Sequence, residues 1–307
     1  MSPPIRLRLG TRASPLARWQ AEWVTARLEE LRIDVELVPI TTTGDRQQGP
    51  IGATTAPGLF TKEIQRALLD DRIDLAVHSL KDLPTEPVPG LSLSAVPQRG
   101  PVADVLASDR WPSLEKLPHG AAVGTGSLRR RSQLAHARPD LVMKDIRGNV
   151  DTRLAKLARG DFDAIVLAEA GLRRLGLDDH IAQLLPDSIM LPAIGQGALG
   201  LETRSDDETA RAALAPLDHP ATHAAVLAER AMLTALEGGC LAPVAALGRM
   251  EDGALELTGR VLSADGKERI EAVDTAAVAD AEALGRRVAQ RLIDQGAADL
   301  IRVSRNG

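Results

Sequence analysis

The sequence is poor in aromatic residues and in cysteine. Aromatic side chains make up 2% of its 307 residues, and tyrosine is absent. Because nucleic-acid bases stack on aromatic rings, single-stranded nucleic acid is a poor candidate partner, and the cores must be aliphatic. The single cysteine, Cys240, excludes an internal disulfide and is typical of a reducing compartment.

An excess of positive charge and a long apolar segment are also missing. The chain has 37 Lys and Arg against 42 Asp and Glu, a net charge of -5. No global field therefore attracts nucleic acid or an anionic membrane, and we expect neither as a partner. No stretch approaches the roughly 20 apolar residues of a membrane span. Met1–Gly10 holds no apolar signal core, so we expect a cytoplasmic protein.

Strand-like and helix-like segments alternate in the first part of the chain. Apolar and polar residues alternate from Ile5 to Leu9, and helical spacing runs from Pro15 to Leu31 with Ser14 as a predicted N-cap. Further strands are predicted at Val35–Ile40 and Ile73–Val77, with a helix that carries Ile64, Ala67 and Leu68 between them. This β-α-β-α-β order predicts a mostly parallel sheet covered by helices.

A second α/β pattern follows, and the last third of the chain then changes character. In the second pattern we predict strands at Ala121–Gly124, Leu141–Ile146 and Ala164–Ala168. A helix is predicted at Val150–Ala158 and a return connection at Leu191–Leu201. In the last third, two helices flank a hairpin with a turn at Asp265-Gly266; the helices are predicted at Ala221–Leu236 and Ala279–Gln295. These elements predict a small C-terminal α+β domain.

Arginines gather where predicted strands give way to loops or helices. The set is Arg12, Arg129, Arg130, Arg147, Arg153 and Arg174. Ligands bind at the carboxyl ends of strands in open α/β sheets, helix N-termini there favour anions, and guanidinium groups grip carboxylates bidentately. We therefore predict a receptor for several carboxylates. The alternative, solvated helix arginines, is the better interpretation for Arg159 or Arg173 taken singly.

Other residue types with chemical potential stand in loops or at strand ends. Asp82 follows a predicted strand and has the chemistry to stabilise a cation, although a surface Lys81–Asp82 salt bridge is an alternative. Cys240 follows two glycines and is either a reachable nucleophile or a small buried hydrophobe. His219 and His223 have helical spacing but no evident third ligand, so we predict no metal site.

In their order and spacing these segments resemble the hydroxymethylbilane synthase (porphobilinogen deaminase) family along nearly the whole chain. The matching stretches are Thr11–Ala17, Val77–Asp82, Gly124–Arg130, Arg147–Val150 with Arg153, Leu191–Ala198 and Glu237–Cys240. The resemblance implies two α/β lobes like those of periplasmic binding proteins, with the active cleft between them, and a small C-terminal α+β domain. The implied boundaries are 1–98 with 198–216 for domain 1, 102–192 for domain 2 and 219–307 for domain 3.

The resemblance also implies a cofactor and a set of site residues. Cys240 matches the position that attaches a dipyrromethane by a thioether, and Asp82 matches the catalytic aspartate. Positions matching cofactor contacts are Ser79, Lys81, Asp82, Thr125, Ser127, Arg129, Arg130 and Arg147. Positions matching substrate contacts are Arg12, Ser14, Gln20, Arg147, Asn149, Arg153, Arg174 and Gln196.

The implied reaction joins four porphobilinogen molecules head to tail, with release of ammonia, to give hydroxymethylbilane for porphyrin and heme biosynthesis. Positive charge develops on pyrrole nitrogen, and a fixed carboxylate at Asp82 would stabilise it most strongly in the transition state. Arginines would neutralise the carboxylates that each ring contributes. A monomer is expected on the same resemblance.

Three positions depart from the family pattern. Pro57 stands where lysine is common, Gly126 where serine is common, and Glu169 where a small or apolar residue is usual. A Glu169 that faced the substrate would repel its carboxylates; the alternative is that it points outward. Two other functions therefore stay open, a catalytically degenerate paralogue and a two-lobed carboxylate-binding protein.

Overall fold

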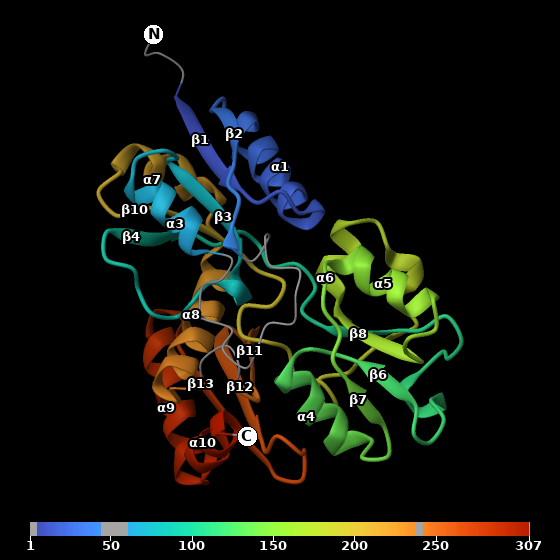
Figure 1. Ribbon diagram of the computed structural model, residues 1–307. Helices are drawn as coiled ribbons and strands as arrows, with labels where there is room; N and C mark the ends of the chain where they lie inside the picture. The colour runs from blue at the N-terminus through green and yellow to red at the C-terminus, as the bar shows by residue number, and fades with distance from the viewer. Residues whose placement is uncertain (1–4, 44–60, 238–241, 307) are drawn as a thin grey trace. The chain divides into compact units, whose positions relative to one another are not determined.

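The computed structural model describes residues 5–43, 61–237 and 242–306 (Figure 1). The chain divides into two compact units. One comprises Met1–Arg99 with Ala198–His223, and the other comprises Gly100–Gly197 with Ala224–Gly307. Among the described residues, no helix is both long and apolar enough to cross a membrane.

The first unit, here called lobe 1, is built around a five-stranded sheet. Its elements are β1 (Arg6–Thr11), α1 (Pro15–Glu30), β2 (Asp34–Pro39), α3 (Lys62–Leu69), β3 (Leu75–Ser79), β4 (Leu91–Ala95), β10 (Leu199–Arg204) and α7 (Glu208–Leu214). The strand order is β2-β1-β3-β10-β4. β1 is parallel to β2 and β3, as the β-α-β-α-β pattern predicts, whereas β10 runs antiparallel to β3 and β4.

Two details of lobe 1 test the local predictions. Helix α1 begins at Pro15, and the Ser14 side chain accepts a hydrogen bond from the Ala17 backbone N–H, so the predicted cap is confirmed. The prediction of a return connection over Leu191–Leu201 is wrong in its last part, because Leu199–Arg204 is a strand inside the sheet. That segment is almost wholly buried, and pairing with β3 and β4 satisfies its backbone.

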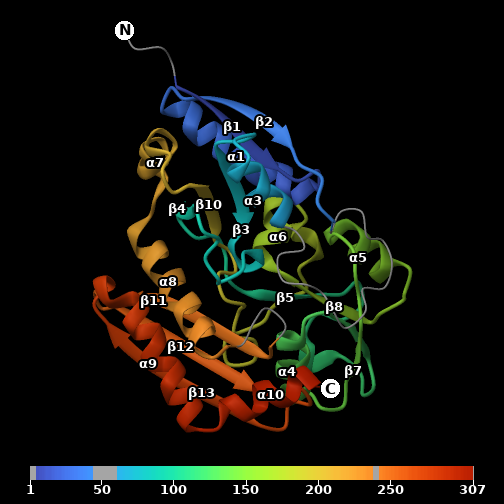
Figure 2. The same ribbon diagram turned by 60° about the vertical axis from the view of Figure 1, so that its left-hand side comes forward.

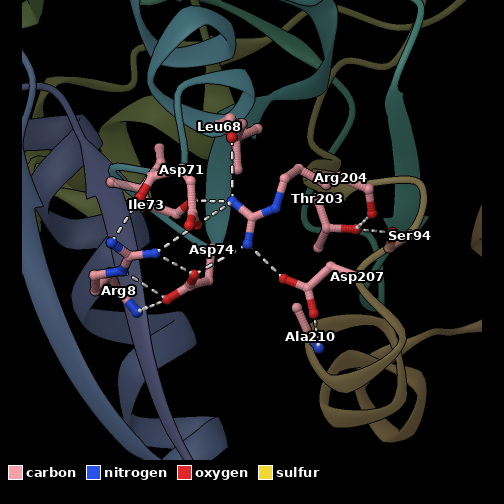
Figure 3. Close-up of polar contacts among 10 residues, drawn as sticks. All are labelled: Arg8, Leu68, Asp71, Ile73, Asp74, Ser94, Thr203, Arg204, Asp207 and Ala210. Carbon is pink, nitrogen blue, oxygen red and sulfur yellow. Dashed lines mark hydrogen bonds and ion pairs between the residues drawn. The ribbon is translucent and has the colours of Figure 1, made fainter.

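An ion-pair network holds lobe 1 together at the amino end of β3 (Figure 3). The Asp74 carboxylate, just before β3, accepts hydrogen bonds from Arg8 Nε at 3.0 Å and Nη2 at 2.7 Å, and from Arg204 Nη2 at 3.1 Å. Arg204 also binds Asp207 at 2.6 Å, and Arg8 binds Asp71 at 2.8 Å. Burial raises the pKa of Asp74, but hydrogen bonds from Arg8 and Arg204 outweigh it and lower that pKa to about 2.

The second unit contains a domain, here called lobe 2, that is built around a matching five-stranded sheet. Its elements are β5 (Asp104–Ala107), β6 (Ala122–Gly124), α4 (Leu128–Ala137), β7 (Val142–Lys144), α5 (Val150–Ala158), β8 (Ala164–Ala168), α6 (Glu169–Arg174) and β9 (Gln183–Leu184). The order β7-β6-β8-β5-β9 repeats that of lobe 1, with β6 parallel to β7 and β8 and β5 antiparallel to its neighbours. The predicted bounds of α5 and β8 are confirmed.

The same unit ends in a smaller α+β domain. Its elements are the end of α8 (Pro220–Ala235), β11 (Val244–Glu251), β12 (Ala254–Leu262), β13 (Arg269–Ala276), α9 (Ala281–Asp294) and α10 (Ala297–Asn306). The three strands form an antiparallel sheet, and Gly266 at the predicted hairpin turn has a φ of 74°. β11 also contacts lobe 2, because Ala246 N donates to Pro192 O at 3.1 Å. The predicted fold class, two α/β lobes and a small C-terminal α+β domain, is confirmed.

Candidate functional site

The lobe 1 residues of the predicted site lie at the carboxyl ends of β1 and β3. Arg12 and Ser14 occupy the turn between β1 and α1, and both are half-buried. Gln20, one turn into α1, is buried and donates through Nε2 to Ser79 Oγ at 2.7 Å. This bond joins α1 to the last residue of β3, so two of the predicted contacts, Gln20 and Ser79, are held together at the carboxyl end of β3.

The proposed acid of the site follows β3 directly. A short 3-10 helix spans Leu80–Asp82, with Leu80 buried, Lys81 half-buried and Asp82 exposed. Leu80 N donates to Ala198 O at 3.0 Å, which fixes the turn to the start of β10. The buried side chain anchors the helix, and the carboxylate two residues later is left at the surface of lobe 1.

Directly beneath that turn, a buried polar group ties β3 to its neighbours. His78 Nε2 lies 3.0 Å from Glu202 Oε2, and Gln65 Nε2 donates to Glu202 Oε1 at 3.0 Å. All three side chains are buried. The contacts link β3 to β10 and β10 to α3, so a buried hydrogen bond from His78 holds the end of β3 against β10.

The lobe 2 residues are centred on the start of α4. Ser127 caps this helix by accepting from Arg130 N at 3.4 Å, and Thr125 Oγ1 accepts from Ser127 N at 3.2 Å. Arg129 and Arg130 follow in the first turn and are buried, 5% and 7% exposed. The sequence predicts both arginines here, but it does not predict that they are withdrawn from solvent.

Burial of two adjacent guanidinium groups is made possible by Asp104, the first residue of β5. Its carboxylate lies 2.7 Å from Arg129 Nη2 and 2.7 Å from Arg130 Nη2. Gln196 Nε2 donates to the same carboxylate at 3.1 Å. Burial raises the Asp104 pKa, yet the two arginines outweigh it and lower that pKa to about 2. Since arginine stays protonated in proteins, the three side chains carry one net positive charge.

Three further arginines of the predicted site belong to lobe 2, and backbone carbonyls accept hydrogen bonds from two of them, Arg153 and Arg174. Arg147 is exposed in the turn after β7, and Arg153 Nε donates to Gly148 O at 2.8 Å. Asn149 precedes α5 without capping it through its side chain. Arg174, the last residue of α6, donates to Gly197 O at 2.7 Å, and burial lowers its pKa to about 10.

Two of the three departures from the family pattern fall on described residues. Glu169 is buried rather than directed outward into solvent, and its Oε1 accepts from Arg173 Nε at 2.7 Å. A neighbouring cation therefore balances its charge. Gly126 is exposed, and a Cβ there would lie 3.1 Å from Ile146 O, so a larger side chain needs a small shift. Pro57 lies outside the described residues, as does Cys240.

Sequence reasoning missed Asp104 and Gln133. Asp104 stands inside the apolar run Val102–Ala107, and an acid in such a run is a signal for a buried ion pair. Gln133 is buried in α4, where its Oε1 accepts from Leu191 N at 2.9 Å and its Nε2 donates to Leu191 O at 3.0 Å. Among the described residues, no group of three or more His, Cys, Asp or Glu side chains is placed to hold a metal ion.

Lobe 1 thus presents an exposed acid and small polar groups, and lobe 2 presents clustered guanidinium groups. Clustered guanidinium groups on an α/β scaffold are typical of proteins that bind anionic small molecules. Residues 7–212 match the family model described as porphobilinogen deaminase, dipyromethane cofactor binding domain, and residues 223–294 match porphobilinogen deaminase, C-terminal domain. The chain belongs to the porphobilinogen deaminase family. Its activity is that of a transferase, hydroxymethylbilane synthase, in porphyrin and heme biosynthesis.

Solved structures with similar folds include two bacterial binding proteins. A putative methionine-binding lipoprotein from Bacillus subtilis is 12% identical, with a TM-score of 0.44, over 69% of this chain and 89% of that chain. A periplasmic substrate-binding protein of an ABC transporter from Coxiella burnetii is 16% identical, with a TM-score of 0.44, over 73% and 94%.

Proposed function

We propose that this chain builds the tetrapyrrole on a dipyrromethane attached to Cys240, with the lobe 2 arginines as carboxylate receptors and Asp82 as the acid that stabilises positive charge. The buried cluster of Arg129, Arg130 and Asp104 carries this proposal. Two guanidinium groups share one carboxylate there, so a net cation is fixed in a buried position at the start of α4. Such a cation is costly to bury and is typical of an anion site.

The donor set of lobe 2 fits a group with several carboxylates. Thr125 and Ser127 add hydroxyl groups at the N-terminus of α4, where the helix dipole also favours negative charge. Arg147 and Arg153 add guanidinium groups around the N-terminus of α5. When bound, the dipyrromethane supplies the pyrrole to which the substrate units are added. Attachment at Cys240 is supported by its match to the family motif and by its being the only cysteine.

Lobe 1 residues would hold the incoming substrate and its developing charge. We assign Arg12, Ser14 and Gln20 to a substrate carboxylate, with Gln20 held by its hydrogen bond to Ser79, which is itself assigned to the cofactor. The Asp82 carboxylate would accept hydrogen bonds from pyrrole N–H groups. Because these bonds strengthen as positive charge develops on nitrogen, they lower the barrier more than they favour substrate binding. Lys81 is assigned to the cofactor carboxylates, and Arg174 and Gln196 to the substrate.

Intact-mass measurement of protein from a porphyrin-competent host tests the proposal. We expect a mass above that of the bare polypeptide, and a ladder of heavier species after addition of porphobilinogen. Cys240→Ser should give the bare mass under both conditions, because the attachment atom is gone. A wild-type protein at the bare mass would contradict the proposal, and a Cys240→Ser protein that keeps the added mass would move the attachment elsewhere.

Further features of the chain belong with this proposal. We propose three domains, with boundaries at 1–98 and 198–216, at 102–192 and at 219–307, since each of the three sheets has its own hydrophobic cluster. A monomeric state and a cytoplasmic location are proposed from the family. Size-exclusion chromatography with light scattering checks the first, and cell fractionation checks the second.

A further inference from the structure

The C-terminal domain contacts the helix that carries the buried arginine pair. His136 lies on the last turn of α4, and its Nδ1 is 2.8 Å from the carbonyl oxygen of Gly266 in the β12–β13 turn. Gly266 fits closely, because a Cβ there would lie 2.6 Å from His136 N and 2.6 Å from Ser132 O. Figures 1 and 2 both show α4 beside this end of the C-terminal sheet. The β12–β13 turn therefore packs directly against the backbone of α4.

A second contact runs through buried hydrogen bonds. Arg260 on β12 is 3% exposed, and its Nη1 donates to Gln133 Oε1 at 2.8 Å while its Nε donates to Glu271 at 2.6 Å. Gln133 is the residue that binds both backbone groups of Leu191. Burial lowers the Arg260 pKa, and the hydrogen bond to Glu271 partly offsets the loss of water around the guanidinium group.

The hydrogen bonds continue from Gln133 to the arginine pair. Leu191 O accepts from Arg129 Nη1 at 2.7 Å, and Gln133 Nε2 also reaches Arg129 O at 3.3 Å. Arg129 in turn binds Asp104, which binds Arg130. An unbroken series of short polar contacts thus links the middle of β12 to both guanidinium groups.

We infer that the C-terminal domain positions the Arg129–Arg130 pair, with Gly266, Arg260 and Gln133 as positioning residues that hold α4 in register. This inference rests on the proposed role of the pair in binding carboxylates. None of the three residues needs to touch cofactor or substrate. They act because displacing α4 along its axis would break the shared contact with Asp104, and buried networks tolerate such displacement poorly.

The two hairpin glycines of the C-terminal sheet offer a matched pair of variants. Gly266 and Gly253 have φ values of 74° and 82°, so alanine is strained at both. Nothing lies within 4 Å of a Cβ at Gly253, whereas a Cβ at Gly266 meets the α4 backbone. Gly253→Ala therefore measures the cost of the backbone strain alone, and Gly266→Ala adds the push on α4.

Hydrogen exchange and steady-state kinetics on the full-length variants test the inference. In Gly266→Ala we expect the amides of α4 to exchange about tenfold faster and KM for porphobilinogen to rise about tenfold, with kcat changed less. Gly253→Ala should show neither effect, and α1 of lobe 1 serves as the internal reference in both. Equal α4 exchange and equal KM in the two variants would overturn the inference.

Two further variants keep the result decisive. If Gly266→Ala does not fold, His136→Ala removes the hydrogen bond to the turn. His119→Ala, at an exposed histidine of lobe 2, is its control.

Arg130→Lys separates the inference from the proposed function. Normal cofactor content and KM in Arg130→Lys would refute the role of the pair, whereas a severe loss there beside a normal Gly266→Ala would refute only the positioning by the C-terminal domain.

Discussion

The two lobes have the same strand order and share a β-α-β-α-β core, yet their site residues differ in charge. In each lobe a serine caps the helix after the first strand of the parallel set, Ser14 before α1 and Ser127 before α4. In both lobes, therefore, the third residue after the strand is a serine that caps the following helix. In lobe 1 the helix then continues with mostly apolar and neutral residues near its start, whereas in lobe 2 two buried arginines follow the cap.

This difference in charge is accompanied by a difference in the antiparallel strand of each sheet, β10 in lobe 1 and β5 in lobe 2. Leu199 opens β10 opposite Ser79, and Asp104 opens β5 opposite Ala168. An apolar residue at this position in lobe 1 has no charge to offer, while the aspartate in lobe 2 compensates two guanidinium groups. The residue at this equivalent position thus differs between the lobes, and only in lobe 2 does it supply the carboxylate that accompanies the buried guanidinium groups. Lobe 1 instead places its ion-pair network at the amino end of β3 (Figure 3).

The largest effect is expected when the acid of lobe 1 is removed, which tests whether the two lobes differ in the charge they supply. Asp82→Asn keeps the shape of the side chain and deletes its charge. We expect kcat to fall by about 100- to 1,000-fold, the loss typical of one electrostatic stabiliser, with the cofactor still attached. Single-turnover consumption of porphobilinogen and intact mass measure the two parts. Glu86→Gln, at an exposed acid in the following loop, is the control and should turn over normally.

The arginine pair of lobe 2 provides the next test. In Arg130→Lys an ammonium cannot replace the Nε and Nη contacts to Asp104 together with the Nη1 contact to Val166 O. We expect the free energy of unfolding to fall by about 1–3 kcal/mol, as for a buried acceptor left unsatisfied, and KM to rise. Arg131→Lys, next in the helix and paired with the exposed Asp145, should cost less than about 0.5 kcal/mol. Equal urea midpoints would show that burial does not matter here.

How far the sequence predicts these features follows from the range of the contacts involved. The starts of α1 and α5 and the span of β8 depend on neighbouring residues, and they are predicted within a residue. The sequence pattern does not predict β5, and it predicts a connection over the start of β10, because each of these strands pairs with strands distant in the chain. The burial of Arg130 depends likewise on an aspartate 26 positions away. The sequence pattern indicates an arginine cluster, but it does not indicate what compensates it.

A third test asks whether the lobe 1 network is structural, in contrast to the lobe 2 cluster. Asp74 has a pKa of about 2 in the fold against an ordinary 3.8, so its contribution is present above about pH 4 and is lost as pH falls toward 2. The difference corresponds to about 2 kcal/mol. We expect Asp74→Asn to lose up to this amount at pH 7 and much less at pH 2.5, with KM unchanged. Urea unfolding at both pH values measures it.

Asp34→Asn is the control for that experiment, because Asp34 pairs with Arg6 at 3.6 Å and both side chains are more than 60% exposed. Exposed pairs of this kind contribute little, so its unfolding free energy should hardly change at either pH. A stability loss in Asp74→Asn that did not shrink on acidification would show that the side chain acts through packing and not through its charge.

The smallest effect is expected at Glu169, the position in lobe 2 that first suggested repulsion of an anionic substrate. Its carboxylate binds Arg173, which also binds Asp178 at 2.8 Å, so Glu169→Ala leaves Arg173 with a partner. We expect a stability loss of about 0.5–1 kcal/mol and a KM within about twofold of the parent, since a charge that is already balanced exerts little net field. If KM instead fell several-fold, the glutamate would be acting on the substrate, and lobe 2 would carry an acid that opposes its own arginines.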